Sequence, residues 1–296
     1  MIILDGSMGN ELLKRSDKPS GGLWSAQFLI DNPNLVKEVH QEYVNAGAKV
    51  ITTNTYSTIP SYLCKFNKTH LMSELVEKAG FLAREVSDEN DRDILVAGAL
   101  PPLDESYRPD LVPDKKTSIP VYEALITILN PYVDLFLCET VSSIAETSNV
   151  LEAIKSKASP EKKIWLSWTL IEDDSSRLRS KESIEDAFNF AEEYNPDAYL
   201  FNCTNPEAIT HGLESLKKLT DKPLGAYPNV FDVPHGWTLD NDVDVQLKDM
   251  SIEKFVNYKN TWESLGAEIV GGCCGIGPEY IAVSYTHLRA HETLVH

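Results

Sequence analysis

The chain has 296 residues, of which 42% are hydrophobic, and it carries a formal net charge of −18 at pH 7. Such an acidic surface repels polyanions, which argues against nucleic acid or an anionic membrane as a partner. The apolar runs fall well short of the roughly 20 residues that a membrane-spanning helix requires, so we expect a globular protein outside the membrane.

The cysteine content and the start of the chain indicate the compartment. Five cysteines are an odd number and lack the dense spacing of a secreted, disulfide-rich domain, so free or metal-bound thiols in a reducing environment fit better. Residues 1–4 are apolar and follow no basic segment, which predicts no secretion signal. We therefore expect a cytoplasmic protein.

Short apolar segments alternate with amphipathic ones along the chain. The strands that this pattern predicts are 1–4, 49–53, 94–99, 133–137, 163–168, 198–201, 223–226 and 267–270. The helices that it predicts are 32–47, 73–87, 120–129, 143–157, 183–194, 206–219 and 251–265, with an irregular, proline-rich stretch before residue 120.

Regular alternation of this kind is typical of a parallel sheet covered by helices. Eight such steps in about 280 residues predict an α/β protein with a closed (β/α)8 TIM barrel. An open, doubly wound sheet would show a similar pattern, but no glycine-rich phosphate-binding fingerprint follows the first predicted strand. We expect a single domain that spans residues 1–283.

Polar residues follow several of the predicted strands directly. In a parallel barrel the carboxyl ends of the strands share one face, and barrel enzymes build their active sites there. The residues at these positions are Asp5, Thr53, Asn54, Glu139, Cys203, Cys273 and Cys274.

Three of these residues predict a metal centre. Cys273 and Cys274 are adjacent and flanked by glycines, which allow a sharp turn, and Cys203 follows the sixth predicted strand. Three thiolates with an open fourth position are typical of a catalytic zinc site, so we expect these cysteines to bind Zn2+. The alternative is that they are ordinary buried thiols.

The chain resembles the homocysteine S-methyltransferase family from Asp-Gly-Ser-Met-Gly-Asn-Glu-Leu at 5–12 to Gly-Gly-Cys-Cys-Gly at 271–275. Shared pieces between them are Leu-Trp-Ser-Ala at 23–26, Thr-Thr-Asn-Thr-Tyr at 52–56, Glu-Thr at 139–140, Asn-Cys at 202–203 and Tyr-Pro-Asn at 227–229. The Gly-Gly-Cys-Cys segment with an upstream Asn-Cys is the specific part. The resemblance implies that the three cysteines named above bind zinc and that the product is methionine.

The resemblance also implies how homocysteine is held. The family's acidic contacts to the amino group of homocysteine fall on Asp5 and Glu139. The alternative is that Asp5 caps a turn and Glu139 caps the following helix. The residues expected to orient the substrate carboxylate or the loop backbone are Thr53, Asn54, Asn202 and Asn229.

Aromatic residues are expected to line the pocket of the methyl donor. Trp24, Tyr56 and Tyr227 offer ring faces that attract a cation by roughly 0.5–2 kcal/mol, although core packing is an alternative for Tyr56. The Leu-Trp-Ser-Ala form resembles members that use S-methylmethionine or S-adenosylmethionine. A betaine donor, another thiol or selenol acceptor, and a zinc-binding scaffold without turnover remain alternatives. In the enzymatic cases, the partners are small-molecule substrates.

The end of the chain departs from the family. Residues 284–296 hold three of the seven histidines and lack the expected amphipathic helix, so we interpret them as an atypical, non-native tail. His287 and His291 share a helical spacing there, and His235 is a further candidate near the site. Cys64 and Cys138 have no partner at metal-ligand spacing and are expected to be structural.

Overall fold

The computed structural model describes residues 1–16, 23–173, 175–231, 233 and 250–285. The strands are β1 (Ile2–Ile3), β2 (Val50–Thr52), β3 (Leu95–Leu100), β4 (Leu135–Val141), β5 (Lys163–Trp168), β6 (Ala198–Asn202), β7 (Leu224–Tyr227) and β8 (Ala267–Val270). They form one eight-stranded parallel sheet in the order β1-β8-β7-β6-β5-β4-β3-β2. A bridge between Leu4 and Val50 joins the two end strands, so the sheet closes into a (β/α)8 barrel, as the sequence predicts.

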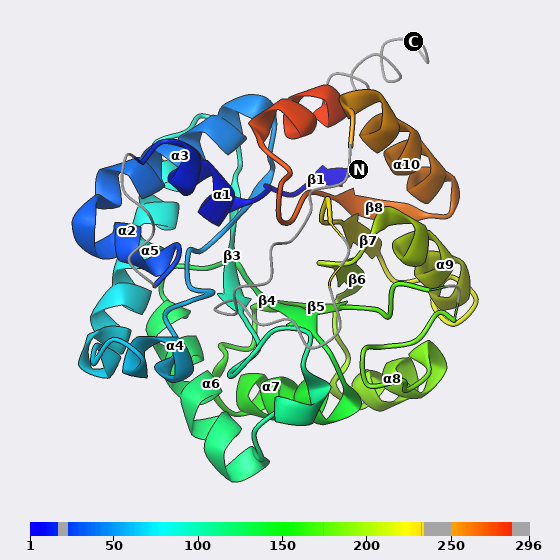
Figure 1. Ribbon diagram of the computed structural model, residues 1–296, viewed down its shortest axis with the longest axis horizontal. Helices are drawn as coiled ribbons and strands as arrows, with labels where there is room; N and C mark the ends of the chain where they lie inside the picture. The colour runs from blue at the N-terminus through cyan, green and yellow to red at the C-terminus, as the bar shows by residue number, and fades with distance from the viewer. Residues whose placement is uncertain (17–22, 174, 232, 234–249, 286–296) are drawn as a thin grey trace.

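Helices surround the barrel (Figure 1). They are α1 (Met8–Lys14), α2 (Ala26–Asp31), α3 (Pro33–Ala46), α4 (Pro60–Cys64), α5 (Met72–Asp88), α6 (Lys115–Leu129), α7 (Ile144–Lys157), α8 (Ile184–Ala191), α9 (Pro206–Leu216) and α10 (Ile252–Ser264). Short 3-10 turns are η1 (Thr69–Leu71), η2 (Pro109–Leu111) and η3 (Glu192–Tyr194). No helix in the described ranges is long and apolar enough to cross a membrane.

Capping side chains explain where many helices begin. In seven of the described helices the side chain of the residue before the helix accepts a backbone N–H of the first turn, which satisfies a donor that the helix leaves open. These residues are Ser7, Asn32, Asp114, Ser143, Ser183, Asn205 and Ser251.

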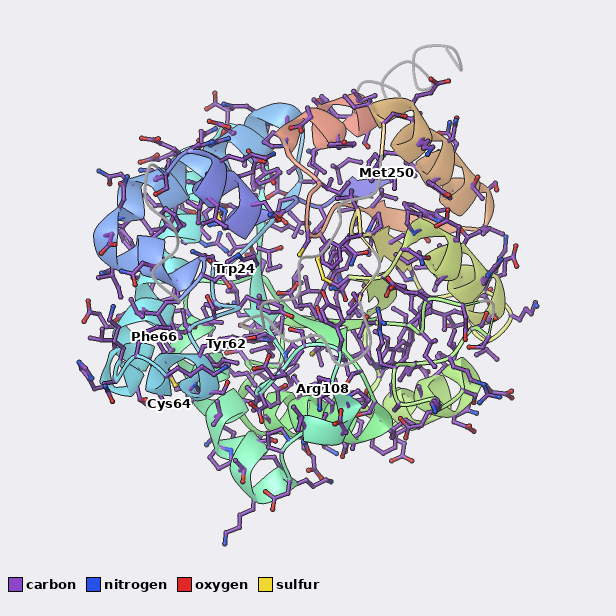
Figure 2. The ribbon with its side chains drawn as sticks, viewed as in Figure 1. Trp24, Tyr62, Cys64, Phe66, Arg108 and Met250 are labelled. Carbon is purple, nitrogen blue, oxygen red and sulfur yellow. A yellow bond between two sulfur atoms is a disulfide. The ribbon has the colours of Figure 1, made fainter. Side chains whose placement is uncertain are left out.

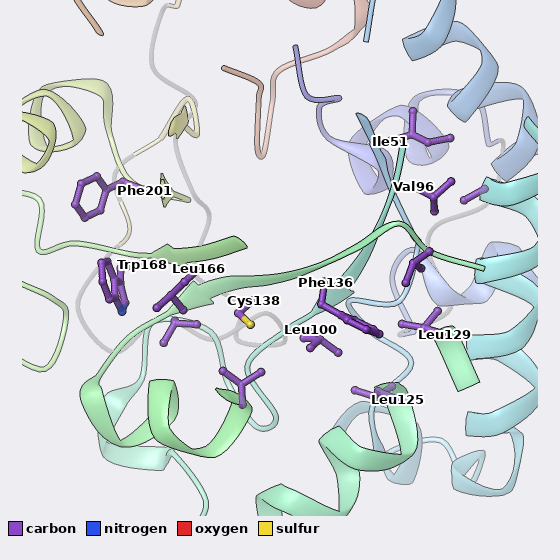
Figure 3. Close-up of a cluster of buried hydrophobic side chains, with 14 of the residues drawn as sticks. Ile51, Val96, Leu100, Leu125, Leu129, Phe136, Cys138, Leu166, Trp168 and Phe201 are labelled. Carbon is purple, nitrogen blue, oxygen red and sulfur yellow. The ribbon is translucent and has the colours of Figure 1, made fainter. Parts of the chain in front are cut away.

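Two apolar layers hold the barrel together. One fills its interior with side chains such as Leu4, Leu137, Trp165 and Leu200. The other packs the outer face of the sheet against the helices, and Figure 3 shows part of it around β3, β4 and β5. Trp165 and Trp168 are thus both packing residues, one in each layer. Each fully buried large apolar side chain of this kind contributes about 1.5–3 kcal/mol.

The structure corrects two sequence-based boundaries and adds helices that the sequence pattern does not predict. Helix α6 begins at Lys115, before the predicted start at residue 120, because Asp114 caps it and Pro120 in its second turn removes one hydrogen bond without ending it. Helices α1, α2 and α4 are short and were absent from the prediction. Strand β4 runs to Val141, so Glu139 lies inside the strand.

The region after β8 is helical from residue 278 to residue 285. Ser284 is buried, and the ring of Tyr285 lies so close to Gly47 that a Cβ there would meet its Cγ at 2.4 Å. The predicted boundary at residue 283 therefore falls inside a packed helix. His287, His291 and His235 lie outside the described residues.

Candidate active site

A cavity opens at the carboxyl ends of the strands and measures about 790 Å³, part of which is open to solvent. This is the size and place expected of a small-molecule site in a barrel. Among the residues predicted from the sequence, those that line it are Asp5, Thr53, Asn54, Glu139, Cys203, Tyr227, Cys273, Cys274, Trp24 and Tyr56.

The three predicted cysteines meet on the wall of this cavity. The Sγ atoms of Cys203, Cys273 and Cys274 all lie within 4.8 Å of one another. Cys203 and Cys273 form a disulfide across 70 positions of sequence, and Cys274 is free. The same sulfurs serve a disulfide or a metal, so metal binding by this set requires the reduced state, in which three thiolates face one point.

Close backbone packing produces the turn that carries the cysteine pair. A Cβ on Gly272 would lie 2.1 Å from Cγ2 of Ile276, so only glycine fits there. Cys273 donates its N–H to the carbonyl of Pro228 at 2.8 Å. Cys203 adopts a positive φ of 46°, which turns the chain sharply after β6.

Two carboxylates face the same cavity. Asp5 accepts hydrogen bonds from the N–H and Oγ1 of Thr52 at 2.7 and 2.9 Å, and burial raises its pKa to about 7. Burial, followed by repulsion from Asp5, raises the pKa of Glu139 to about 8. Neither forms an ion pair within the described residues, and no Lys, Arg or His in that part of the chain lines the cavity. The cavity is thus prepared to accept positive charge.

Thr53 and Asn54 line the cavity but use their polar atoms within the protein. Oγ1 of Thr53 accepts the N–H of Ala99 at 3.0 Å. Nδ2 of Asn54 donates to the carbonyl of Ser25 at 3.1 Å, next to Trp24. These contacts fix the loop after β2 against its neighbours.

Asn202 does not line the cavity; of the two roles expected of it, a contact with the substrate carboxylate or with backbone, its bonds are of the second kind. Its Oδ1 accepts the N–H of Thr140 and the Oγ of Ser167 at 2.8 and 2.7 Å, and its Nδ2 donates to Oγ1 of Thr140 at 2.8 Å. These bonds join β4, β5 and β6. Asn202 therefore positions Thr140, the residue next to Glu139, because both the oxygen and the nitrogen of its amide bond within these three strands.

Asn229 does not line the cavity either. Its side chain is fully buried, and neither amide atom has a hydrogen-bond partner in the described part of the chain. Its neighbour Val230 donates its N–H to the carbonyl of Cys274 at 3.1 Å, so Asn229 lies next to the segment that supports the cysteine pair.

Aromatic side chains form another part of the wall. Trp24 lies on the inner side of the helical ring, whereas Cys64 lies near its rim (Figure 2). The rings of Trp24 and Tyr56 meet edge to face at 6.1 Å between centroids. The hydroxyl groups of Tyr56 and Ser106 share a hydrogen bond of 2.5 Å.

The sequence-based prediction missed several lining residues. Ser106 and Tyr107 come from the proline-rich stretch after β3, where no periodic pattern marked a site. Ser7, Met8 and Gly9 lie in the Asp-Gly-Ser-Met-Gly segment, which was noted only for its resemblance to the family.

Other acidic and thiol candidates are structural. Glu146 is buried and accepts the N–H and Oγ of Ser142 at 2.7 and 2.8 Å, while Ser143 caps the same helix. Cys138 belongs to the outer apolar layer (Figure 3), and Cys64 is exposed.

Comparison with known proteins gives a consistent result. The family model described as homocysteine S-methyltransferase matches residues 2–286. Homocysteine S-methyltransferase of Escherichia coli (strain K12) is 30% identical, with 95% of this chain and 93% of the relative covered. The protein YbgG of Bacillus subtilis (strain 168), which carries the same name, is 27% identical, with 99% and 96% covered.

Solved structures agree with this match. The metallated form of the homocysteine methyltransferase MmuM from Escherichia coli has a TM-score of 0.80 at 27% identity, with 97% of this chain and 96% of that chain covered. Its oxidized form has a TM-score of 0.82 with the same identity and coverage. On the family match over nearly its whole length, together with the barrel and its cavity, the chain belongs to the homocysteine S-methyltransferase family of enzymes.

Proposed function

We propose that the protein transfers a methyl group from a sulfonium donor, S-methylmethionine or S-adenosylmethionine, to the thiolate of L-homocysteine in a zinc-dependent reaction that yields methionine. The observation that carries this proposal is the composition of the cavity wall. It combines three sulfurs, two carboxylates without ion-pair partners and aromatic rings, and the described residues add no basic group to it. A cationic donor and a substrate ammonium group fit such a wall.

Zinc is the metal that suits this donor set. Cys203, Cys273 and Cys274 in their reduced form would hold it, because three thiolates are soft ligands. No fourth cysteine or histidine of the described residues joins the cluster, which leaves a position for a ligand from solution. Zinc held by these residues would lower the pKa of the substrate thiol and so supply a nucleophilic thiolate at neutral pH. The need for reduced cysteines supports a cytoplasmic location.

The chain's own residues bind and orient the acceptor. Asp5 and Glu139 would pair with the ammonium group of homocysteine and direct its sulfur toward the cysteine cluster. An ammonium group would also offset the burial that raises both pKa values. Thr53 and Asn54 would hold the loop against which the substrate carboxylate lies.

The aromatic wall receives the donor. Trp24, Tyr56 and Tyr227 would surround the sulfonium, which carries the positive charge next to the methyl group. The acceptor sulfur forms a bond to the methyl carbon while the donor sulfur leaves with the electron pair of its own bond. Thiolate and sulfonium charges cancel, and two neutral thioethers result.

A selenol acceptor is a second candidate. Selenocysteine methyltransferase of Astragalus bisulcatus is 27% identical, with 98% of this chain and 93% of the relative covered. A betaine donor would also satisfy the cationic preference of the wall.

Donor assays on the reduced, zinc-loaded protein test the proposal. Turnover of homocysteine with S-methylmethionine or S-adenosylmethionine is expected, and turnover with betaine alone would contradict it. The metal content should be close to one zinc per chain and should fall strongly in Cys273→Ser. A Cys138→Ser variant is the matched control, because Cys138 lies in the outer layer and should leave zinc content unchanged.

A further inference from the structure

A buried charged pair lies beside the site and takes no part in the chemistry proposed above. Arg179 and Glu172 belong to the segment between β5 and α8, which folds back on itself through an antiparallel bridge between Leu170 and Leu178. The side chains of Arg179 and Glu172 are only 11% and 8% exposed, with Nη2 and Oε1 3.6 Å apart. Burying two charged groups costs desolvation free energy, so a pair at this position is expected to have a structural or functional role.

The pair connects the loops around the cysteine cluster. Glu172 accepts the N–H of Asn205 at 3.0 Å and that of Val233 at 2.6 Å. Nε of Arg179 donates to Oγ1 of Thr169 at 3.4 Å, at the end of a segment that continues β5. The segments after β5, β6 and β7 are thus held together at one point.

Arg179 also contacts Tyr107, which lies in the stretch after β3. Its Cζ lies over the ring of Tyr107, 5.2 Å from the centroid. Tyr107 is 9% exposed, lines the cavity and has a positive φ of 65°. A bulky residue in this backbone conformation is uncommon, and such residues cluster at active sites and ligand-binding sites.

We propose that Tyr107 is a further donor-binding residue and that Arg179 is the positioning residue that holds its ring on the cavity wall. The guanidinium lies over the ring of Tyr107, and Tyr107 lines the cavity. Tyr107 follows Ser106, whose hydroxyl is bonded to Tyr56, so one loop fixes two of the aromatic residues. The proposal rests on the function proposed above, because it assigns these residues to the cationic donor.

Steady-state kinetics of the reduced, zinc-loaded enzyme test this inference. Tyr107→Ala should raise the KM for the sulfonium donor about tenfold, which corresponds to about 1.4 kcal/mol, and leave the KM for homocysteine within about twofold. Tyr107→Phe keeps the ring and should stay close to wild type. Tyr107→Leu takes the place of the alanine variant if the latter does not fold.

The positioning role has its own comparison. Arg179→Met should raise the donor KM several-fold with little change in kcat, and Arg179→Lys, which restores the charge but not the planar stack, should recover part of the effect. A donor KM equal to wild type in Tyr107→Ala or Tyr107→Leu overturns the inference, as does a loss of zinc that accounts for the whole defect of Arg179→Met. A wild-type enzyme without sulfonium-dependent turnover overturns the proposed function itself, and this first measurement separates the two failures.

Discussion

Two glutamates show how a single side chain's surroundings decide its role. Glu139 and Glu146 lie close in sequence, and burial raises the pKa of both, to about 8 and about 7. Glu146 is satisfied by Ser142 at the start of α7, and Glu139 faces the cavity without an ion-pair partner in the described part of the chain. Glu146 therefore fixes the backbone just before α7, whereas Glu139 is available to a ligand.

Glu139→Gln should therefore raise the KM for homocysteine about 30-fold or more, since truncating one partner of a buried charge pair costs about 2 kcal/mol or more. Zinc content should stay near one equivalent. Glu146→Gln is the matched control: it should lower the free energy of unfolding by about 1 kcal/mol and leave this KM within about twofold. Equal increases of KM in the two variants would contradict the assignment of Glu139.

His40 provides a test of pH dependence. It is fully buried in α3, neither ring nitrogen has a hydrogen-bond partner among the described residues, and burial lowers its pKa from 6.5 to about 4. Between these values the unfolded chain binds a proton that the folded protein does not, so stability is lost as the pH falls through this window. At pH 5 the loss amounts to about 2 kcal/mol relative to pH 8.

The change His40→Leu should remove this component. Urea unfolding at pH 8 and pH 5 measures it: the wild type should lose about 2 kcal/mol more than the variant over this interval. A variant with the same pH dependence as the wild type would show that His40 is protonated or hydrogen-bonded in the folded protein.

At the scale of elements, short helices and strand ends shape the donor side of the cavity. Helix α1 places Gly9 directly under the indole of Trp24, where a Cβ would lie 2.3 Å from Cζ2 of the ring. Trp24 itself has a positive φ of 43°, which is uncommon for a residue other than glycine. Because Gly9 has no side chain, helix α1 leaves room for the indole of Trp24 at this position.

Gly9→Ala should displace the indole and raise the donor KM about fivefold, equivalent to about 1 kcal/mol, with the KM for homocysteine unchanged. Gly266→Ala is the control, because its φ of +93° strains an alanine while the nearest atom to the added Cβ is 3.8 Å away. It should reduce stability alone. A donor KM that stays at the wild-type value in Gly9→Ala would remove Trp24 from the donor pocket.

At the scale of the whole molecule, closure of the barrel brings distant segments together. Cys203 and Cys273 are separated by 70 residues, yet their Cα atoms are 5.7 Å apart. The helix that follows β8 completes the outer layer, where Tyr285 packs against Gly47. The integrity of this last helix therefore affects stability more than chemistry.

Two truncations separate the packed helix from the residues beyond it. A chain that ends at Tyr285 should keep its zinc and unfold within about 0.5 kcal/mol of the full chain. A chain that ends at Val283 loses Ser284 and Tyr285 and should be less stable by about 2 kcal/mol, with zinc content still intact. Denaturant titration and metal analysis distinguish these outcomes, and loss of zinc in the chain that ends at Tyr285 would assign residues 286–296 a role at the site.

The sequence by itself determined the alternation of strands and helices, the starts of six longer helices and the strand ends where the cysteines lie. These features depend on local periodicity and capping, so Ser143 and Ser183 mark their helices without knowledge of the fold. Only the tertiary structure decided which polar side chains reach the cavity. Asn202 bonds between strands, and Tyr107, which no sequence pattern marked, lines the cavity. The reason is that the orientation of such side chains depends on contacts between residues far apart in the chain.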